Sequence, residues 1–97
     1  MRIIALSTLR TFWEKHPITE QPLKAWYADA KKSSWKSFHD IKQTYPSASI
    51  VGSDRVVFNI KGNDYRLIGL VRFRDGKIFI RFIGTHAEYN KIDARTI

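Results

Sequence analysis

The sequence contains no cysteine among its 97 residues, which excludes disulfide scaffolds, thiolate metal sites and cysteine nucleophiles. Its 5 glycines are scattered singly, so the chain has no glycine-rich loop that could cradle a phosphate. No apolar run approaches the roughly 18 residues of a membrane span, and the N-terminus lacks the architecture of a signal peptide. Metal-ligand spacings and a Ser-His-Asp arrangement are also missing. We therefore expect a cytoplasmic protein with no metal, no cofactor and no membrane partner.

Positive charge is what the sequence has in excess. The chain carries 17 Lys+Arg against 9 Asp+Glu, a formal net charge of +8, and this charge is spread evenly along its length. A hydrophobic content of 43% and an aromatic content of 13% are higher than a disordered polycation carries, and they predict one folded domain over residues 1–97. The excess charge favours a polyanionic partner, either nucleic acid or an acidic protein.

Apolar residues in the first half of the chain repeat with helical spacing, after a short strand that we expect at residues 2–6. The repeats are Leu9, Phe12 and Trp13, then Leu23, Trp26, Tyr27 and Ala30, then Trp35, Phe38, Ile41 and Tyr45. We expect Ser7 to cap the first helix and Pro17 to end it. Pro22 suits the first turn of the second helix, and Pro46 ends a shorter third one.

From residue 55 the hydrophobic period changes to 2, after a predicted loop at 47–49. Three runs separated by turn signals at 61–64 and 74–76 predict an antiparallel meander. Alternation gives each strand an apolar face, which we expect to pack on the helices. These faces are Val56, Phe58 and Ile60, then Tyr65, Leu67, Gly69, Val71 and Phe73, then Ile78, Ile80 and Phe82. The predicted fold class is α+β, with a short N-terminal strand and two to three helices on one face of an antiparallel sheet whose last three strands form the meander.

The opposite face of this sheet is predicted to be open and basic, with Val57, Phe79 and Ile83 among its cations. Its charged side chains are Arg55, Lys61, Arg66, Arg72, Lys77 and Arg81. Arginine binds phosphate bidentately and an aromatic ring can stack on a base, so the face is suited to RNA. The residues expected to bind RNA are Arg55, Arg72, Lys77, Phe79 and Lys91. The alternative is that the charges only keep an exposed sheet face soluble.

Residues capable of chemistry gather where the last strand ends. RNA cleavage without a metal needs a base for the 2′-OH proton, cations for the charged phosphorane and an acid for the 5′-oxygen. His86 lies just past the strand and is suited to proton transfer near neutral pH, while Tyr89 could stack on a base or assist that transfer. Arg66 and Arg81 could hold the phosphate. Lys61 could contact phosphate or act as a base.

Each assignment has a structural alternative. His86 can be a cap or a surface residue, and Tyr89 and Ile92 can pack a terminal helical turn onto the sheet. Glu88 can simply screen Lys91. Two other histidines at helix ends are left out of the candidate set: His16 and His39.

Two stretches of the sequence resemble the HigB toxins of bacterial type II toxin-antitoxin systems, which are RelE-like mRNA interferases. They run from Val57 to Leu67, around Lys61-Gly62-Asn63-Asp64-Tyr65-Arg66, and from Lys77 to Asp93, around Gly84-Thr85-His86-Ala87-Glu88-Tyr89. Length, basic charge and the order of helices and meander agree as well. Asn90 stands where many relatives carry an acidic residue, which removes one alternative base.

The resemblance implies a RelE-like, ribosome-dependent endoribonuclease that cuts mRNA in the 30S decoding site and leaves a 2′,3′-cyclic phosphate. It also implies a HigA-type helix-turn-helix antitoxin that inhibits the enzyme, with operator DNA bound only through the antitoxin complex. Carried over by motif, the catalytic set corresponds to Lys61, Arg66, Arg81, His86 and Tyr89. The competing hypothesis is a non-catalytic basic RNA- or ribosome-binding module that blocks translation.

Overall fold

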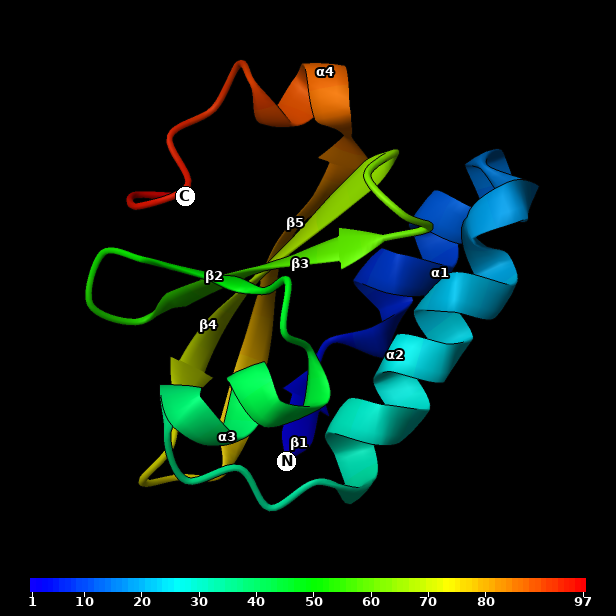
Figure 1. Cartoon of the computed structure of the whole chain (residues 1–97). Helices are drawn as coiled ribbons and strands as arrows, with labels where there is room; N and C mark the ends of the chain where they lie inside the picture. Colours follow the sequence, from blue (N-terminus) through cyan, green and yellow to red (C-terminus); the bar gives the residue numbers. More distant parts are fainter.

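The structure is built around a five-stranded sheet in the order β1-β5-β4-β3-β2. The computed structural model describes residues 1–97 (Figure 1). Its elements are β1 (Arg2–Ile4), α1 (Leu6–Lys15), the 3-10 turn η1 (Pro17–Thr19), α2 (Glu20–Lys32), α3 (Phe38–Thr44), β2 (Ser49–Val51), β3 (Arg55–Ile60), β4 (Tyr65–Arg72), β5 (Lys77–Thr85) and α4 (His86–Tyr89). Strands β2 to β5 pair antiparallel, and β1 pairs parallel with β5. The predicted α+β class and meander are confirmed.

Helices α1 and α2 lie along one face of the sheet, as Figure 1 shows. Their buried residues are the ones that the helical spacing predicted: Leu9, Trp13, Leu23, Trp26 and Ala30. The indole of Trp26 meets the ring of Phe58 from β3 edge-on, with ring centroids 5.2 Å apart. These contacts join both helices to the sheet in one core of 14 buried residues. No helix of the chain combines the length and the apolar character that crossing a membrane requires.

Helix boundaries differ from the prediction where a local hydrogen bond decides them. Helix α1 begins at Leu6, one residue before the expected cap Ser7, and has no side-chain cap. Helix α3 begins later than predicted, because the Ser37 side chain accepts a hydrogen bond from the Asp40 N–H and caps the helix there. Trp35 therefore precedes the helix, although its side chain is still buried in the core.

Residues 49–51 form a short edge strand, although Ser49 was predicted to lie in a loop. Strand β2 pairs antiparallel with β3, with Ser49 opposite Val57 and Val51 opposite Arg55. A strand of 3 residues is too short to show an alternating hydrophobic pattern, so the sequence carries no signal for it. Its role is to extend the sheet beyond β3.

A β-bulge in β5 reverses the alternation of side chains along that strand. The pairing of β4 with β5 shifts between Ile68 and Gly69, which leaves Arg81 as the extra residue. Phe82 was predicted to face the helices and Ile83 to face away, and both assignments are wrong. Phe82 packs in the cluster on the far face, whereas Ile83 packs against the helix-side core.

The sheet face opposite the helices is covered at its centre by the C-terminal segment that follows α4. Val57, predicted to be exposed, is only 3% exposed there, because Val57, Ile68 and Ala94 form a second buried cluster. The apolar residues packed around this cluster are Val51, Phe82, Tyr89, Ile92 and Ile97. The alternative that Tyr89 and Ile92 pack a terminal turn onto the sheet is thus confirmed. A sheet with apolar residues on both faces needs a cover on both faces.

Gly84 is predicted to be intolerant of even a methyl group. A Cβ at Gly84 would lie 2.5 Å from Cζ of Phe82 and 3.1 Å from Oε1 of Glu88. We expect Gly84→Ala to destabilise the fold by about 1–3 kcal/mol, because the half-buried Phe82 ring must move. Urea unfolding measures this loss, with the exposed turn variant Ser53→Ala as the neutral control. An unchanged unfolding midpoint for Gly84→Ala would contradict the packing described here.

Candidate functional site

The turn between β3 and β4 is hydrogen-bonded to the start of α4. The main-chain N–H of His86 donates to the main-chain oxygen of Asp64 at 3.1 Å. We call the end of the sheet formed by residues 61–66 and 84–89 the α4 end (Figure 1). Four residues of the predicted catalytic set come from these segments: Lys61, Arg66, His86 and Tyr89.

Arg66 is the best-placed cation of the α4 end. Its Nη1 donates to the Asn63 carbonyl oxygen at 2.7 Å, and its guanidinium carbon lies 5.8 Å from the centroid of the Tyr89 ring. No carboxylate forms an ion pair with it. The guanidinium is therefore held in place by a neutral acceptor and an aromatic face, and its charge remains available for an anion.

Lys61 lies in the turn itself, with a left-handed backbone at φ 52°. Its Nζ is 3.5 Å from the Asp64 carboxylate, and both side chains are exposed. An exposed pair of this kind contributes little to stability, so a phosphate can displace Asp64 from Lys61 at small cost.

Glu88 has a structural task at the α4 end. Its carboxylate accepts a hydrogen bond from the Thr85 N–H at 2.8 Å, while the Thr85 hydroxyl accepts one from the Glu88 N–H at 3.1 Å. This reciprocal pair is a capping box that begins α4. The main-chain and side-chain hydrogen bonds to Thr85 lower the pKa of Glu88 below its ordinary value of 4.5, with smaller contributions from His16 and Lys91. The sequence interpretation that Glu88 only screens Lys91 missed this cap, and a carboxylate held in this way is a weak base.

His86 is the first residue of α4 and its side chain is exposed. Because the capping box fixes the backbone of residues 85–88, the imidazole projects from an ordered position beside the turn that carries Lys61.

Arg81 and Arg55 lie away from the α4 end, at the covered centre of the sheet. Both donate to the main-chain oxygen of Ile97: Arg55 through Nε at 3.0 Å and Nη2 at 2.7 Å, and Arg81 through Nε at 3.3 Å. Arg55 also pairs with Asp54 at 2.6 Å. Arg81 precedes Gly84, the register partner of Arg66, by three residues, so it lies roughly 10 Å along the strand from the α4 end. The structure therefore does not bring Arg81 together with the other four candidates.

The remaining predicted RNA contacts are dispersed. Arg72 and Lys77 are paired across β4 and β5 at the opposite end of the sheet, and Phe79 is half-buried between Leu70 and Ile4. Lys91 is exposed just after α4. These residues do not form one continuous surface with Arg66.

His16 reaches the α4 end from the helical layer, and sequence reasoning left it out. Its ring stacks on Phe12 with centroids 4.3 Å apart and meets Tyr65 edge-on at 6.1 Å. Tyr65 is the register partner of Thr85, so the His16 ring lies on the helix side of the α4 end. The sequence indicates only that His16 ends a helix before Pro17, and nothing in the pattern tells which strand that helix end meets.

The arrangement offers an ordered arginine, an aromatic ring, an exposed imidazole and a lysine around one end of the sheet. These are groups that can bind a phosphodiester, stack on a base and exchange a proton. No three side chains of His, Cys, Asp or Glu gather closely enough to hold a metal ion.

Sequence comparisons agree with this fold. Residues 19–92 match the family described as HigB_toxin, RelE-like toxic component of a toxin-antitoxin system. The mRNA interferase toxin HigB of Escherichia coli (strain K12) is 30% identical over 92 residues, which cover 93% of this chain and 88% of that relative. The mRNA interferase HigB of Shigella flexneri matches to the same extent. The mRNA interferase HigB of Escherichia coli O6:H1 is 23% identical over 94 residues, covering 95% and 91%.

An α+β fold with this sheet and this match defines a RelE-like toxic component of a toxin-antitoxin system. Within that class, the chain belongs to the HigB toxin family. The resemblance noted in residues 57–67 and 77–93 is confirmed, and the match extends it into the helical half of the chain.

The capping box predicts a specific pH dependence of stability. Because the folded pKa of Glu88 lies below its ordinary value of 4.5, its charged form stabilises the fold above about pH 4.5, and this contribution is lost as the pH falls through the folded pKa. We expect the free energy of unfolding in urea to fall more steeply below pH 4.5 for the wild type than for Glu88→Gln, whose amide can still cap the helix. Glu14→Gln, at an exposed position of α1, should follow the wild type. Parallel curves for the wild type and Glu88→Gln would contradict the assignment.

Proposed function

We propose that this chain is an mRNA interferase, an endoribonuclease that breaks translated mRNA by attack of the 2′-OH without a metal ion. The curated HigB relatives bear the name mRNA interferase, and the chain matches them over nearly its whole length. The observation that carries the proposal is the α4 end, where an arginine without a carboxylate partner lies beside an aromatic ring and an exposed histidine.

The chemistry divides into two proton transfers and one displacement. A base takes the proton of the 2′-OH, the 2′-oxygen attacks phosphorus, and the 5′-oxygen leaves with a proton from an acid. The products are a 2′,3′-cyclic phosphate and a 5′-OH. We assign one of the two proton transfers to His86 and stabilisation of the phosphorane charge to Arg66, with Tyr89 stacking on a neighbouring base.

The other cations extend the binding surface in this proposal. Lys61 contacts the phosphate from the opposite side of the turn, where its exposed partner Asp64 is easily displaced. Arg81 lies three residues before Gly84 on β5 and binds an adjacent phosphate, since its side chain is exposed and makes a single hydrogen bond, to the main-chain oxygen of Ile97. Arg55, Arg72, Lys77 and Lys91 add long-range attraction for the RNA backbone.

The site contains few catalytic groups, and dependence on the ribosome accounts for this. A message held in the 30S decoding site is already positioned, so the protein needs to supply only charge, a stacking surface and proton transfer. Toxin-antitoxin membership implies an antitoxin partner. We propose that the antitoxin is of the HigA helix-turn-helix type, that the complex alone contacts operator DNA, and that all of this takes place in the cytoplasm.

Loss of His86 or Arg66 is expected to abolish cleavage without unfolding the protein. In a bacterial translation extract, His86→Ala should reduce the rate of ribosome-dependent cutting by about 10²- to 10⁴-fold, the usual range for one acid or base. Arg66→Ala should reduce it by a similar factor through lost charge stabilisation. His39→Ala is the matched control, because His39 is an exposed histidine on α3, and it should cut at the wild-type rate. Far-UV circular dichroism checks that each variant is folded.

The same extract tests the alternative of a non-catalytic module. Intact messages despite arrested translation, with the effect weakened gradually by each Lys or Arg substitution and strongly by salt, would favour a basic ribosome-binding protein and exclude the nuclease. Cuts that persist without ribosomes would contradict ribosome dependence while leaving the nuclease assignment in place.

A further inference from the structure

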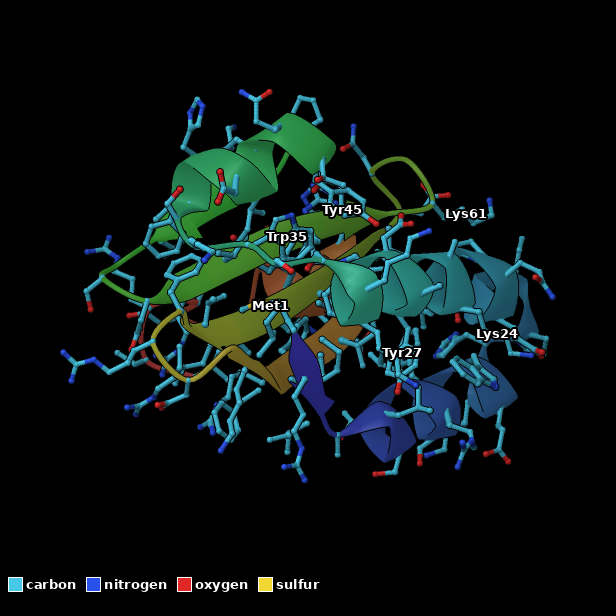
Figure 2. The ribbon with its side chains drawn as sticks, turned by 90° about the horizontal axis from the view of Figure 1, so that it is seen from below. Met1, Lys24, Tyr27, Trp35, Tyr45 and Lys61 are labelled. Atoms are coloured by element: carbon cyan, nitrogen blue, oxygen red, sulfur yellow. The ribbon has the colours of Figure 1, made fainter.

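A cavity of about 970 Å³ opens at the end of the sheet opposite the α4 end. It lies between the start of β1, the β4–β5 turn and the loop that follows α2, and we call it the β1-end cavity. Tyr27 from α2 and Trp35 from that loop line it, and both are labelled in Figure 2, which views the molecule from below. Six residues of β4 separate Arg66 from Arg72 beside the cavity, so the cavity is roughly 20–25 Å from Arg66. Nothing assigned to RNA cleavage lies in it.

The rim of the β1-end cavity is strongly basic. Four cationic side chains border it, Arg2, Lys31, Lys36 and Arg74, against the single carboxylate of Asp75. None of these cations takes part in an ion pair. The ratio of cations to anions at the rim exceeds the ratio for the whole chain, which is 17 to 9.

A row of like charges continues from the rim onto the sheet. Arg2 of β1 is the register partner of Lys77 in β5, and Lys77 is the partner of Arg72 in β4. Like charges directly opposite one another in a sheet are destabilising. Three such cations on adjacent strands, without a carboxylate among them, form a surface that an acidic partner would neutralise.

The walls of the cavity are apolar, but their aromatic faces are already occupied. Trp35 is 6% exposed and its indole N–H donates to the Thr44 hydroxyl at 3.2 Å. The Lys31 ammonium lies 5.7 Å from the Tyr27 ring centroid, and Phe73 meets Phe38 edge-on at 4.9 Å. A nucleic acid base needs a free ring face for stacking. An aliphatic side chain needs only an apolar wall, so the cavity fits a peptide better than it fits RNA.

We propose that the β1-end cavity is a docking site for an acidic peptide segment of a partner protein. An apolar side chain of the segment enters the cavity against Ile3, Tyr27, Trp35 and Phe73. Its flanking carboxylates pair with Arg2, Lys36 and Arg74, and further acidic residues follow the row formed by Lys77 and Arg72. The cavity itself is separate from the α4 end, and only Lys77 and Arg72, which add long-range attraction for RNA, are shared between the two proposed surfaces.

The experiment titrates the ¹⁵N-labelled protein with a short acetylated peptide in which aspartates and glutamates flank one central leucine, and follows amide and indole shifts by NMR. We expect the largest shifts at Ser34, Trp35, Arg74 and Gly76, and weaker binding when the leucine is replaced by glycine. The variant Arg74→Glu with Lys36→Glu should lose about tenfold in affinity, because two attractive charges become repulsive. The matched control reverses two exposed charges elsewhere, Arg10→Glu with Arg95→Glu, and should bind nearly as well as the wild type.

Three outcomes would overturn the proposal. Equal losses in the two double variants would mean that only net charge attracts the peptide, and shifts centred on the sheet face would place the peptide elsewhere. Stronger shifts of the cavity residues with a single-stranded RNA oligonucleotide than with the peptide would assign the cavity to RNA. The Arg74→Glu, Lys36→Glu variant should keep its cutting activity in the translation extract, so failure of the docking proposal and failure of the nuclease proposal are distinguishable.

Discussion

The β-bulge at Arg81 is the constraint on which the two faces of the sheet depend. Before the bulge, β5 directs Ile78 and Ile80 toward the helices. After it, Phe82 points to the far face and Ile83 to the helices. A ring at Phe82 on the far face provides a surface on which the C-terminal segment packs, and it also leaves room only for glycine at position 84. The capping box of Thr85 and Glu88 begins α4 directly after this glycine.

The functional consequence is a division of the basic charge into separate regions. At the centre of the sheet, Arg55 and Arg81 hold the Ile97 main-chain oxygen. At the α4 end, Arg66 is oriented by Tyr89 and by the Asn63 carbonyl oxygen, and its charge is not neutralised. At the β1 end the cations border a cavity. A single uniformly basic RNA-binding face, as alternation in the strands predicts, is replaced by three regions with different neighbours and, in our proposals, different partners.

The fold class was predictable because it depends on periodicity, and the two periods in this sequence are clear. The helix residues Leu9, Trp13 and Trp26 and the strand residues Val56 and Phe58 are buried as their spacing indicates. The bulge was not predictable, because one extra residue leaves an apparently regular alternation on both sides of it. The burial of Val57 was missed for a related reason. The C-terminal segment that covers it has no helix or strand after α4, so no periodic pattern in the sequence predicts that it packs there.

The candidate site was predictable in its chemistry and only partly in its geometry. Lys61, Arg66, His86 and Tyr89 are close in space because a turn and a strand end meet, which the meander already implies. Arg81 was included by strand parity and by the family motif, but it lies three residues before Gly84, the register partner of Arg66, and therefore away from the rest. The roles of Glu88 and His16 could be seen only in the structure. The capping box of Glu88 depends on local hydrogen bonds, and the contact of His16 with Tyr65 depends on how the helix docks on the sheet.

The central claim, that this HigB-family chain cuts RNA by 2′-OH attack, is tested most directly by the chemistry of the new RNA ends. A message cut in a bacterial translation extract should carry a 2′,3′-cyclic phosphate upstream of the cut and a 5′-OH downstream. The upstream end resists tailing until the cyclic phosphate is removed enzymatically, and the downstream end resists ligation until its 5′-OH is phosphorylated. A 3′-OH and a 5′-phosphate at the cut would require water or another nucleophile in place of the 2′-OH, and would contradict the roles given to His86 and Arg66.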